Sequence, residues 1–466
     1  MSQAPEAPPV DPPRPDAPPV DAPRPAAAPV AQAERIAIID AVRGVALLGI
    51  LLMNIPIFAL PERFDEPWRA DTGSADFWVH AFNIVFFEGK MRALFSAVFG
   101  AGIVLFTLGK ERAGRPATGL FYRRMLWLTL FGLAHAHLLL WLGDVLYFYG
   151  VIGMLAFLLR RVPPRRLALG VPLVAVVGFA ASVLFYQNMR AKRLAWREAV
   201  TAQAEGRALG PAQTEALAAW REVEKNFIPN REEIAQHTAL MKGTYGQVAS
   251  FVRPKAAEGE FKYLLLGLWD MLALMLLGIA LYRWGFFTLQ WSDRAYKRTA
   301  LIGYALGLPA VVFSHVYIVL TFPTLDAMLA GLERIPVPWT GALYDLQRIA
   351  LMMAHVSVLM LAYRAGWLPG LFARLRAVGQ MAFTNYILQT VICSLVFFGY
   401  GLNQFAAWRY HQLYALVAAV WVLQLALSPL WLRAFHFGPL EWLWRTLTYW
   451  KPQPFVRREP AAAAAA

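Results

Sequence analysis

The sequence is poor in cysteine and in charged residues, and it lacks the common catalytic motifs. Cys393 is the only cysteine among 466 residues, which excludes an intrachain disulfide bond and leaves no cysteine–histidine zinc spacing. Charged residues make up 16% of the chain, against about 25% in an average soluble protein. The patterns G-x-S-x-G, H-E-x-x-H and the P-loop are absent, so hydrolase, zinc-protease and nucleotide-driven motor classes have no support.

What the sequence does contain is long apolar runs. Hydrophobic residues make up 58% of the chain, and 17 residues are tryptophan. Because about 20 consecutive apolar residues can cross a bilayer, we expect an all-α, polytopic integral membrane bundle with about ten transmembrane helices. The shortest expected span, 145–159, has the length of a buried helix as well as of a crossing. The expected spans lie near 41–60, 91–109, 124–142, 145–159, 167–187, 262–282, 299–322, 341–363, 379–400 and 412–434.

The basic residues fall mostly in short loops between these spans. Lysines and arginines cluster in 110–124, 160–166, 294–298 and 364–376, which all lie on one side of the membrane if the spans alternate. Since positive charge favours the cytoplasmic side, both termini are predicted to face the cytoplasm. The net charge of +14 is then explained by topology and lipid head-group contact, and we expect no nucleic-acid partner.

The chain divides into five regions by composition. Residues 1–34 are too rich in proline and alanine to pack a core, so this tail is predicted to be disordered. Two transmembrane halves, 35–187 and 261–434, flank a polar insert. The span count places that insert, 188–260, outside the cytoplasm, where we expect a mostly helical cap. Residues 435–466 form the C-terminal segment.

Two shorter helices are expected at the membrane surface. In the C-terminal segment, Pro439 suits the first helical position and Glu441 the first turn, which predicts an interfacial helix on the cytoplasmic face. Before the second span, Ser74 or Asp76 is suited to cap a helix within 74–88. That segment either lies on the membrane, re-enters it or spans it.

Polar residues within the apolar runs are the candidates for function, because ionisable groups are costly inside a bilayer. At the start of the first span, Asp40 either caps the helix or pairs with Arg43 three residues on. Arg43 either reaches the lipid head groups or presents its guanidinium to a phosphate. Asn54, deeper in the same span, either joins two helices by a hydrogen bond or contacts the substrate.

The stretch "RRMLWLTLFGLAHAHLLLWLGDVLYFYG" carries the most polar groups. His135 and His137 are two residues apart, so on a helix they point in nearly opposite directions and one should face inward. Asp144 either caps the next helix or returns beside His135 and orients its imidazole for general-base catalysis. We predict His135 and Asp144 as catalytic residues and expect no metal site.

Other side chains are predicted to contact the substrate from both sides of the bundle. Asn385 and Gln389 are four residues apart and form a polar stripe on an apolar helix, which is typical either of helix–helix contact or of a small-molecule site. Basic and acidic residues near the ends of the spans complete the set. These further candidates are Arg92, Arg123, Arg124 and Glu441.

Six motifs between residues 35 and 448 together carry a family resemblance. They are "IDAVRG", "LLGILLMNI", "LFSAVFGAGI", "GLAHAHLLLWLGDVLYFYGVIG", "VGQMAFTNYILQTVI" and "FGPLEWLWRTLT". On these motifs the chain resembles the YeiB-like family, whose function is uncharacterised and for which transport has been proposed. The resemblance implies a multi-pass protein of the bacterial inner (cytoplasmic) membrane.

A more distant resemblance, confined to the start of the first span, is to the transmembrane acyltransferase superfamily. Its members often begin with a similar Asp-x-x-Arg-Gly motif and an Arg-x10-His spacing. Here Arg43 is in place, but Asn54 stands where the histidine would be. The resemblance implies transfer of an acyl group from acyl-CoA, with His135 as the substitute base and Asp144 orienting it.

These observations predict a membrane acyltransferase. An acyl-CoA-like donor would bind from the cytoplasm near Arg43, Arg123 and Arg124, and the acceptor would be a small molecule or lipid within or across the membrane. The alternative is a transporter or lipid flippase that uses the same polar path, and a third reading is a non-catalytic membrane scaffold. Membrane lipids are expected partners, and a homo-oligomer is compatible with the sequence.

Overall fold

The computed structural model describes residues 32–61, 71–112, 117–228 and 230–457. Over these residues the protein is all-helical, as the composition predicts, and its one isolated backbone bridge joins Phe435 to Val456. Most of the tail predicted to be disordered, and the alanines that end the chain, lie outside the described residues.

The helices follow one another with short connections. The first half of the chain forms α1 (Gln32–Ala59), α2 (Ala75–Phe86), α3 (Lys90–Arg112), α4 (Thr118–Leu138), α5 (Leu146–Leu158), α6 (Pro164–Ala168) and α7 (Gly170–Ala204). The rest forms α8 (Pro211–Phe227), α9 (Arg231–Met241), α10 (Tyr245–Arg283), α11 (Asp293–Thr321), α12 (Leu325–Arg334), a 3-10 turn (Trp339–Gly341), α13 (Ala342–Arg364), α14 (Pro369–Gln380), α15 (Ala382–Phe397), α16 (Tyr410–Ala434) and α17 (Pro439–Tyr449).

The chain is a multi-pass membrane protein by the length and apolar character of its helices. Six described segments are long and apolar enough to cross a bilayer, and two bent helix pairs bring the number to eight. The expected span 145–159 corresponds to α5, which has 13 residues and is shorter than a full crossing requires.

Two of the expected spans are bent. The segment 379–400 contains a break at Met381, where α14 and α15 meet at 84°. The expected span 262–282 is the second half of α10, which bends by 62° near its middle. α7 and α10 also run without interruption past residues 187 and 261, so the polar insert is continuous with the bundle.

Helices form at both of the short segments, 74–88 and the start of the C-terminal segment. Ser74 caps α2, and its side chain accepts a hydrogen bond from the backbone N–H of Phe77. Pro439 is the first residue of α17, and Glu441 lies in its first turn. The cap and the proline therefore fix the starts of these helices as the sequence predicts.

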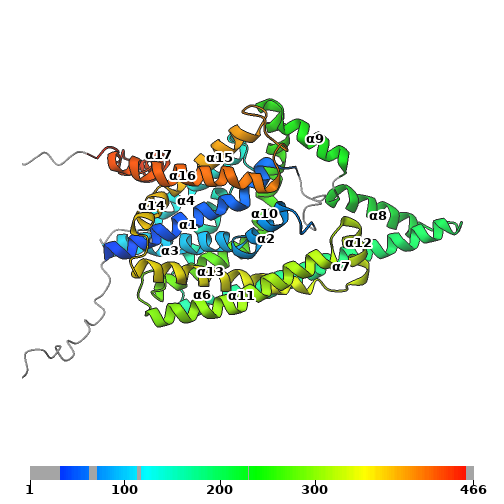
Figure 1. Cartoon of the computed structure of the whole chain (residues 1–466), viewed down its shortest axis with the longest axis horizontal. Helices are drawn as coiled ribbons and strands as arrows, with labels where there is room; N and C mark the ends of the chain where they lie inside the picture. The colour runs from blue at the N-terminus through cyan, green and yellow to red at the C-terminus, as the bar shows by residue number, and fades with distance from the viewer. Residues whose placement is uncertain (1–31, 62–70, 113–116, 229, 458–466) are drawn as a thin grey trace, which may run out of the picture.

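α1 lies in the middle of the bundle, packed on α3, α13, α14, α15 and α16 (Figure 1). The start of α1 and α17 are found at one end of the molecule, and α7 and α8 extend furthest at the opposite end (Figure 1). The candidate residues near the start of α1 and on α17 are therefore separated from the far end of the polar insert by the length of the bundle.

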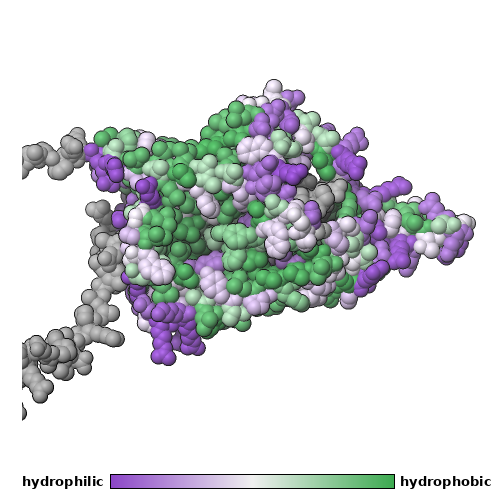
Figure 2. Space-filling model, in the orientation of Figure 1, coloured by the Kyte–Doolittle hydropathy of each residue, from purple (hydrophilic) through white to green (hydrophobic). Residues whose placement is uncertain are grey.

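Many hydrophobic side chains are exposed on the outer surface of the bundle. Figure 2 shows hydrophobic side chains over much of the middle and hydrophilic ones gathered at the two ends. The apolar stretch of the candidate span formed by α6 and α7 is only 6% buried, and the exposed residues of α7 include Leu173, Val176 and Leu184. Such an apolar outer face is what contact with lipid requires.

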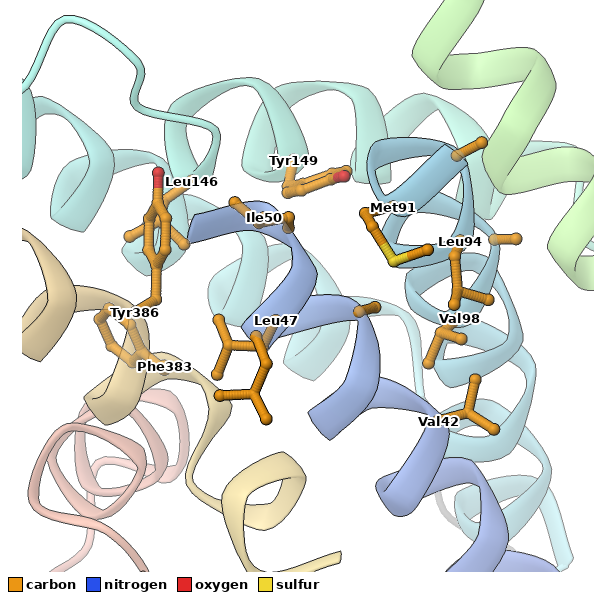
Figure 3. Close-up of a cluster of buried hydrophobic side chains, with 14 of the residues drawn as sticks. Val42, Leu47, Ile50, Met91, Leu94, Val98, Leu146, Tyr149, Phe383 and Tyr386 are labelled. Carbon is orange, nitrogen blue, oxygen red and sulfur yellow. The ribbon is translucent and has the colours of Figure 1, made fainter. Parts of the chain in front are cut away.

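The core is built around one face of α1. Leu47 and Ile50 lie between Met91 and Leu94 of α3 on one side and Tyr386 of α15 on the other (Figure 3). These side chains are almost fully buried. Packing at this density holds α15 against the bundle, and α15 supplies a residue of the site described below.

Glycine sets the closest helix–helix approach. A Cβ atom at Gly100 of α3 would collide with the carbonyl oxygen of Met275 in α10, and one at Gly278 of α10 would collide with that of Ala97. Two residues from Gly100 on the same helix, Gly102 has open space around it.

We expect Gly100→Ala to lower the melting temperature of the purified protein, because the methyl group must push α3 and α10 apart. The cost should be about 1–3 kcal/mol, the usual range for overpacking. Gly102→Ala is the matched control and should leave the melting temperature unchanged or raise it. Equal effects of the two substitutions on thermal unfolding would contradict the close contact.

Candidate functional site

His135 and Asp144 meet in the turn between α4 and α5. Nδ1 of His135 lies 2.7 Å from Oδ1 of Asp144, and the other carboxylate oxygen, Oδ2, accepts a hydrogen bond from the backbone N–H of Tyr147 at 2.8 Å. Asp144 therefore caps the start of α5 and also holds the imidazole of His135. The side chains are 0% and 5% exposed.

Thr390 of α15 completes a chain of three groups. Its hydroxyl lies 2.9 Å from Nε2 of His135, and Thr390 itself is 1% exposed. When Nδ1–H donates to Asp144, Nε2 is the basic nitrogen and accepts the threonine proton. A hydroxyl, an imidazole and a carboxylate in this order form the arrangement that activates a nucleophile. We call these three residues the His–Asp–Thr group.

An aromatic pair holds the turn in place. The hydroxyl of Tyr386 donates to the carbonyl oxygen of Gly143 at 3.1 Å and accepts from Trp141 Nε1 at 3.2 Å. The Tyr386 ring meets the His135 ring edge-on at 5.1 Å, and Trp141 stacks on Phe58 of α1 at 3.7 Å. Tyr386 therefore packs directly against the imidazole, and its hydrogen bond with Trp141 holds Tyr386 in place.

His137 faces away from this group, as the two-residue spacing predicts. Its Nε2 lies 3.1 Å from a carboxylate oxygen of Glu260 in α10, and its side chain is 29% exposed. His135 is the inward-facing histidine of the pair. His137 consequently offers a control for any test of His135.

A second polar region lies at the other end of α4, where α17 packs against it. The Arg124 guanidinium lies over the Trp444 ring at 3.7 Å, while Trp444 Nε1 donates to the Arg124 carbonyl oxygen at 2.8 Å. Arg123 donates to the carbonyl oxygen of Thr448 at 3.2 Å and lies over the Trp450 ring at 4.4 Å.

Arg445 joins this region, and sequence reasoning did not single it out. Arg124 interacts electrostatically with Arg445, Arg43 and Glu441, which places these side chains together. Among the described residues, neither Arg124 nor Arg445 has a carboxylate at ion-pair distance; both lie over aromatic rings. Burial lowers the pKa of Arg445 below its ordinary value, and Glu441 and Asp40 partly offset this. We call Arg43, Arg124 and Arg445 the arginine cluster.

The carboxylate of Glu441 binds the start of α15. Its carboxylate accepts hydrogen bonds from the backbone N–H groups of Phe383 at 2.7 Å and Thr384 at 3.0 Å, and from the Thr384 hydroxyl at 2.6 Å. Burial raises the pKa of Glu441, and these hydrogen bonds oppose the rise. Glu441, which the sequence predicts as a substrate contact, thus acts as a cap supplied by another helix, and it makes no ion pair with Arg124 or Arg445 among the described residues.

Asp40 and Arg43 pair as one of the alternatives predicts. Arg43 Nη1 lies 2.7 Å from Oδ1 of Asp40, and it also approaches the carbonyl oxygen of Gly379 at 3.4 Å. The capping alternative for Asp40 is wrong, because α1 already begins at Gln32. An interior position leaves Asp40 no free helix N–H groups to cap.

The remaining substrate-binding candidates lie outside both polar regions. Asn385 donates to Ser428 at 3.0 Å, and Gln389 donates to Gln424 at 3.1 Å, so the polar stripe joins α15 to α16. Arg92 lies 3.4 Å from Asp270, which is also bound by Arg348. Asn54 is half-buried on α1 and makes no hydrogen bond to a described residue. No group of three metal-ligating side chains occurs in the described part of the chain.

Comparison with known proteins places the chain in a family. It is 30% identical to "Uncharacterized protein YeiB" of Escherichia coli (strain K12), over 91% of this chain and 99% of that protein. The chain belongs to the YeiB-like family. It is also 28% identical to "Uncharacterized protein YxaH" of Bacillus subtilis (strain 168), over 91% of this chain and 97% of that protein. No solved structure is significantly similar to it.

A second comparison covers the C-terminal part of this YeiB-like protein. Residues 281–451 match the family described as "Protein of unknown function (DUF418)". This region contains Thr390, Glu441 and Arg445, while His135 and Asp144 of α4 and the following turn lie before it. The His–Asp–Thr group therefore joins the matched region to the N-terminal half.

Two signals could have led to the missed residues. Tyr386 and Thr390 are four residues apart and share one face of a helix. When Tyr386 packs against His135, the hydroxyl of Thr390 therefore lies on the same side. Arg445 follows Glu441 by the same spacing on α17, next to arginines of another helix. Neither pairing across helices is visible before the chain is folded.

We expect Glu441→Ala to destabilise the protein by about 1–2 kcal/mol, because two N–H groups at the start of α15 lose their acceptor. Thermal unfolding of the purified protein would measure this loss. Glu258→Ala, which removes an exposed carboxylate paired with Lys262, is the control and should cost less than about 0.5 kcal/mol. Equal melting temperatures for the two variants would contradict the capping role.

Proposed function

We propose that this YeiB-like protein is an acyltransferase of the bacterial inner membrane. Ten spans, with α4 and α5 counted as two, would place both termini in the cytoplasm. The start of α1 and α17 lie at one end of the bundle, which supports placing both termini on the same side of the membrane (Figure 1). The observation that carries the function is the His–Asp–Thr group, in which Nε2 of His135 lies 2.9 Å from the Thr390 hydroxyl and Nδ1 is held by Asp144.

The proposed reaction has two steps. Thr390 Oγ1 attacks the carbonyl carbon of the donor thioester while its proton passes to Nε2 of His135. The carbon–sulfur bond then breaks, and the thiol leaves with that proton. In the second step a hydroxyl or amine of the acceptor attacks the threonine ester, and Thr390 regains its hydroxyl through His135.

The arginine cluster would bind the anionic part of the donor. Arg124 and Arg445 lie at one end of the bundle with no carboxylate at ion-pair distance among the described residues. Guanidinium groups bind phosphate through paired hydrogen bonds. Arg124 and His135 lie on the same helix, eleven residues apart, which is about 16 Å along its axis. An extended thioester donor suits that separation.

A transporter or lipid flippase is the second candidate, and one observation favours it. The 84° break between α14 and α15 puts a helix start within one membrane-length segment, and transporters bind anionic substrates at such broken helices. Here Glu441 already occupies that helix start. Substrate movement across vesicle membranes without an acylated product would favour this candidate over the enzyme.

The enzymatic test follows release of free thiol from acetyl-CoA by protein purified in detergent. We expect a burst of about one thiol per chain in the absence of acceptor, because the acyl group stays on the protein. His135→Ala should slow the burst by about 10²–10⁴-fold. His137→Ala is the matched control and should retain the burst. A folded His135→Ala variant with unchanged kinetics would rule out the assignment.

The donor site has a separate prediction. Arg124→Ala and Arg445→Ala should each weaken binding of free CoA by about tenfold, because a charge-assisted hydrogen bond contributes about 1.5 kcal/mol or more. Isothermal titration calorimetry would measure the dissociation constants. Arg166→Ala removes the same charge from an exposed site and serves as the control. Similar weakening by all three variants would show a general charge effect without a donor site.

A further inference from the structure

A large cavity lies apart from the His–Asp–Thr group. Its volume is about 750 Å³, and its walls come from α2, α7, α8, α11, α12 and α13. Most of the lining is apolar, including Phe185, Trp220, Val311, Leu332 and Trp339. A cavity of this size and character is suited to a chain-like apolar ligand.

Three side-chain atoms around this cavity lack hydrogen-bond partners. The hydroxyl of Ser314, Nε2 of His315 and Oε1 of Gln347 are buried and make no hydrogen bond to any described residue. Ser314 and Gln347 are 7% and 8% exposed. Buried polar atoms in native proteins are nearly always paired. Three unpaired atoms on neighbouring helices α11 and α13, around one cavity, indicate a ligand with a polar group.

A cation lines the same cavity. Lys90 is 2% exposed, and its ammonium group donates to the carbonyl oxygen of Ile84 at 2.6 Å. An ammonium group has three N–H donors, and no carboxylate lies at ion-pair distance from Lys90 among the described residues. Glu88 also lines the cavity, at an exposed position, and interacts with Lys90 only electrostatically. The polar group of the ligand is therefore expected to be an anion.

Part of the cavity wall is also exposed at the apolar surface. Phe185, Ile318 and Met328 line the cavity and are also 56%, 47% and 39% exposed. They belong to α7, α11 and α12, and α7 carries the apolar outer face described above. A ligand can therefore enter from the hydrocarbon phase of the membrane.

We propose that this cavity binds an amphiphile with one acyl chain and an anionic head, either a carboxylate or a phosphate. The chain lies against Phe185, Trp220 and Leu332, and the head lies among Lys90, Gln347 and Ser314. This inference goes beyond the proposed acyl transfer. It involves neither His135 nor the arginine cluster.

The test is equilibrium binding of radiolabelled oleate to the full chain, immobilised in detergent, by scintillation proximity. We expect saturable binding of about one oleate per chain, and competition by oleyl alcohol at least tenfold weaker than by oleate, because the alcohol has no charge for Lys90. Lys90→Met should weaken oleate binding about tenfold. Stronger competition by lysophosphatidate than by oleate would assign a phosphate head, and the reverse order a carboxylate.

Two tryptophan substitutions make the test independent of Lys90. Leu332→Trp fills the cavity and should reduce oleate binding at least tenfold, whereas Leu320→Trp, at a site 75% exposed on α11, should not change it. His135→Ala should also leave oleate binding unchanged. The proposal would be overturned by any one of three results. These are no saturable oleate binding, competition by oleyl alcohol as strong as by oleate, and unchanged oleate binding by a folded Leu332→Trp variant.

Discussion

A carboxylate withdrawn from water inside a helical bundle is costly unless its oxygens are paired, and Asp144 is paired on both of them. One oxygen holds the imidazole of His135, and the other accepts the N–H of Tyr147. The first contact fixes which ring nitrogen is basic, and the second fixes the start of α5. Because His135 then reaches Thr390, this one carboxylate links α4, α5 and α15. Tyr386, which accepts a hydrogen bond from Trp141, packs against the His135 ring of this group.

α4 and α15 connect the arginine cluster with the His–Asp–Thr group. α4 carries Arg124 in its first turns and His135 in its last. α15 begins at the carboxylate of Glu441 and presents Thr390 further along. Both helices therefore run from the region around α17 toward the His–Asp–Thr group. A donor that is charged at one end and reactive at the other would follow this direction.

The sequence predicts the fold class and much of the local structure, because apolar runs, Ser74 and Pro439 act within a few residues. It also predicts that one histidine of the pair His135 and His137 faces inward, since helical spacing decides that. Contacts between residues far apart in the chain could not be predicted in this way. Thr390 lies 255 positions from His135 along the chain, and only packing of α15 against the bundle brings the two together. The break at Met381 was likewise hidden, since the apolar run continues through it.

The central claim is that Thr390 carries the acyl group, and mass spectrometry of the protein tests it directly. The purified chain is mixed with acetyl-CoA, quenched in acid and digested, and the peptides of α15 are analysed. In the unaltered protein we expect one acetyl group on Thr390, and in Thr390→Ser one on the serine. Thr390→Val should carry none, and in His135→Ala the acetyl group should form about 10²–10⁴-fold more slowly. Thiol release that continues in Thr390→Val, with no acetylated α15 peptide in any variant, would contradict this claim.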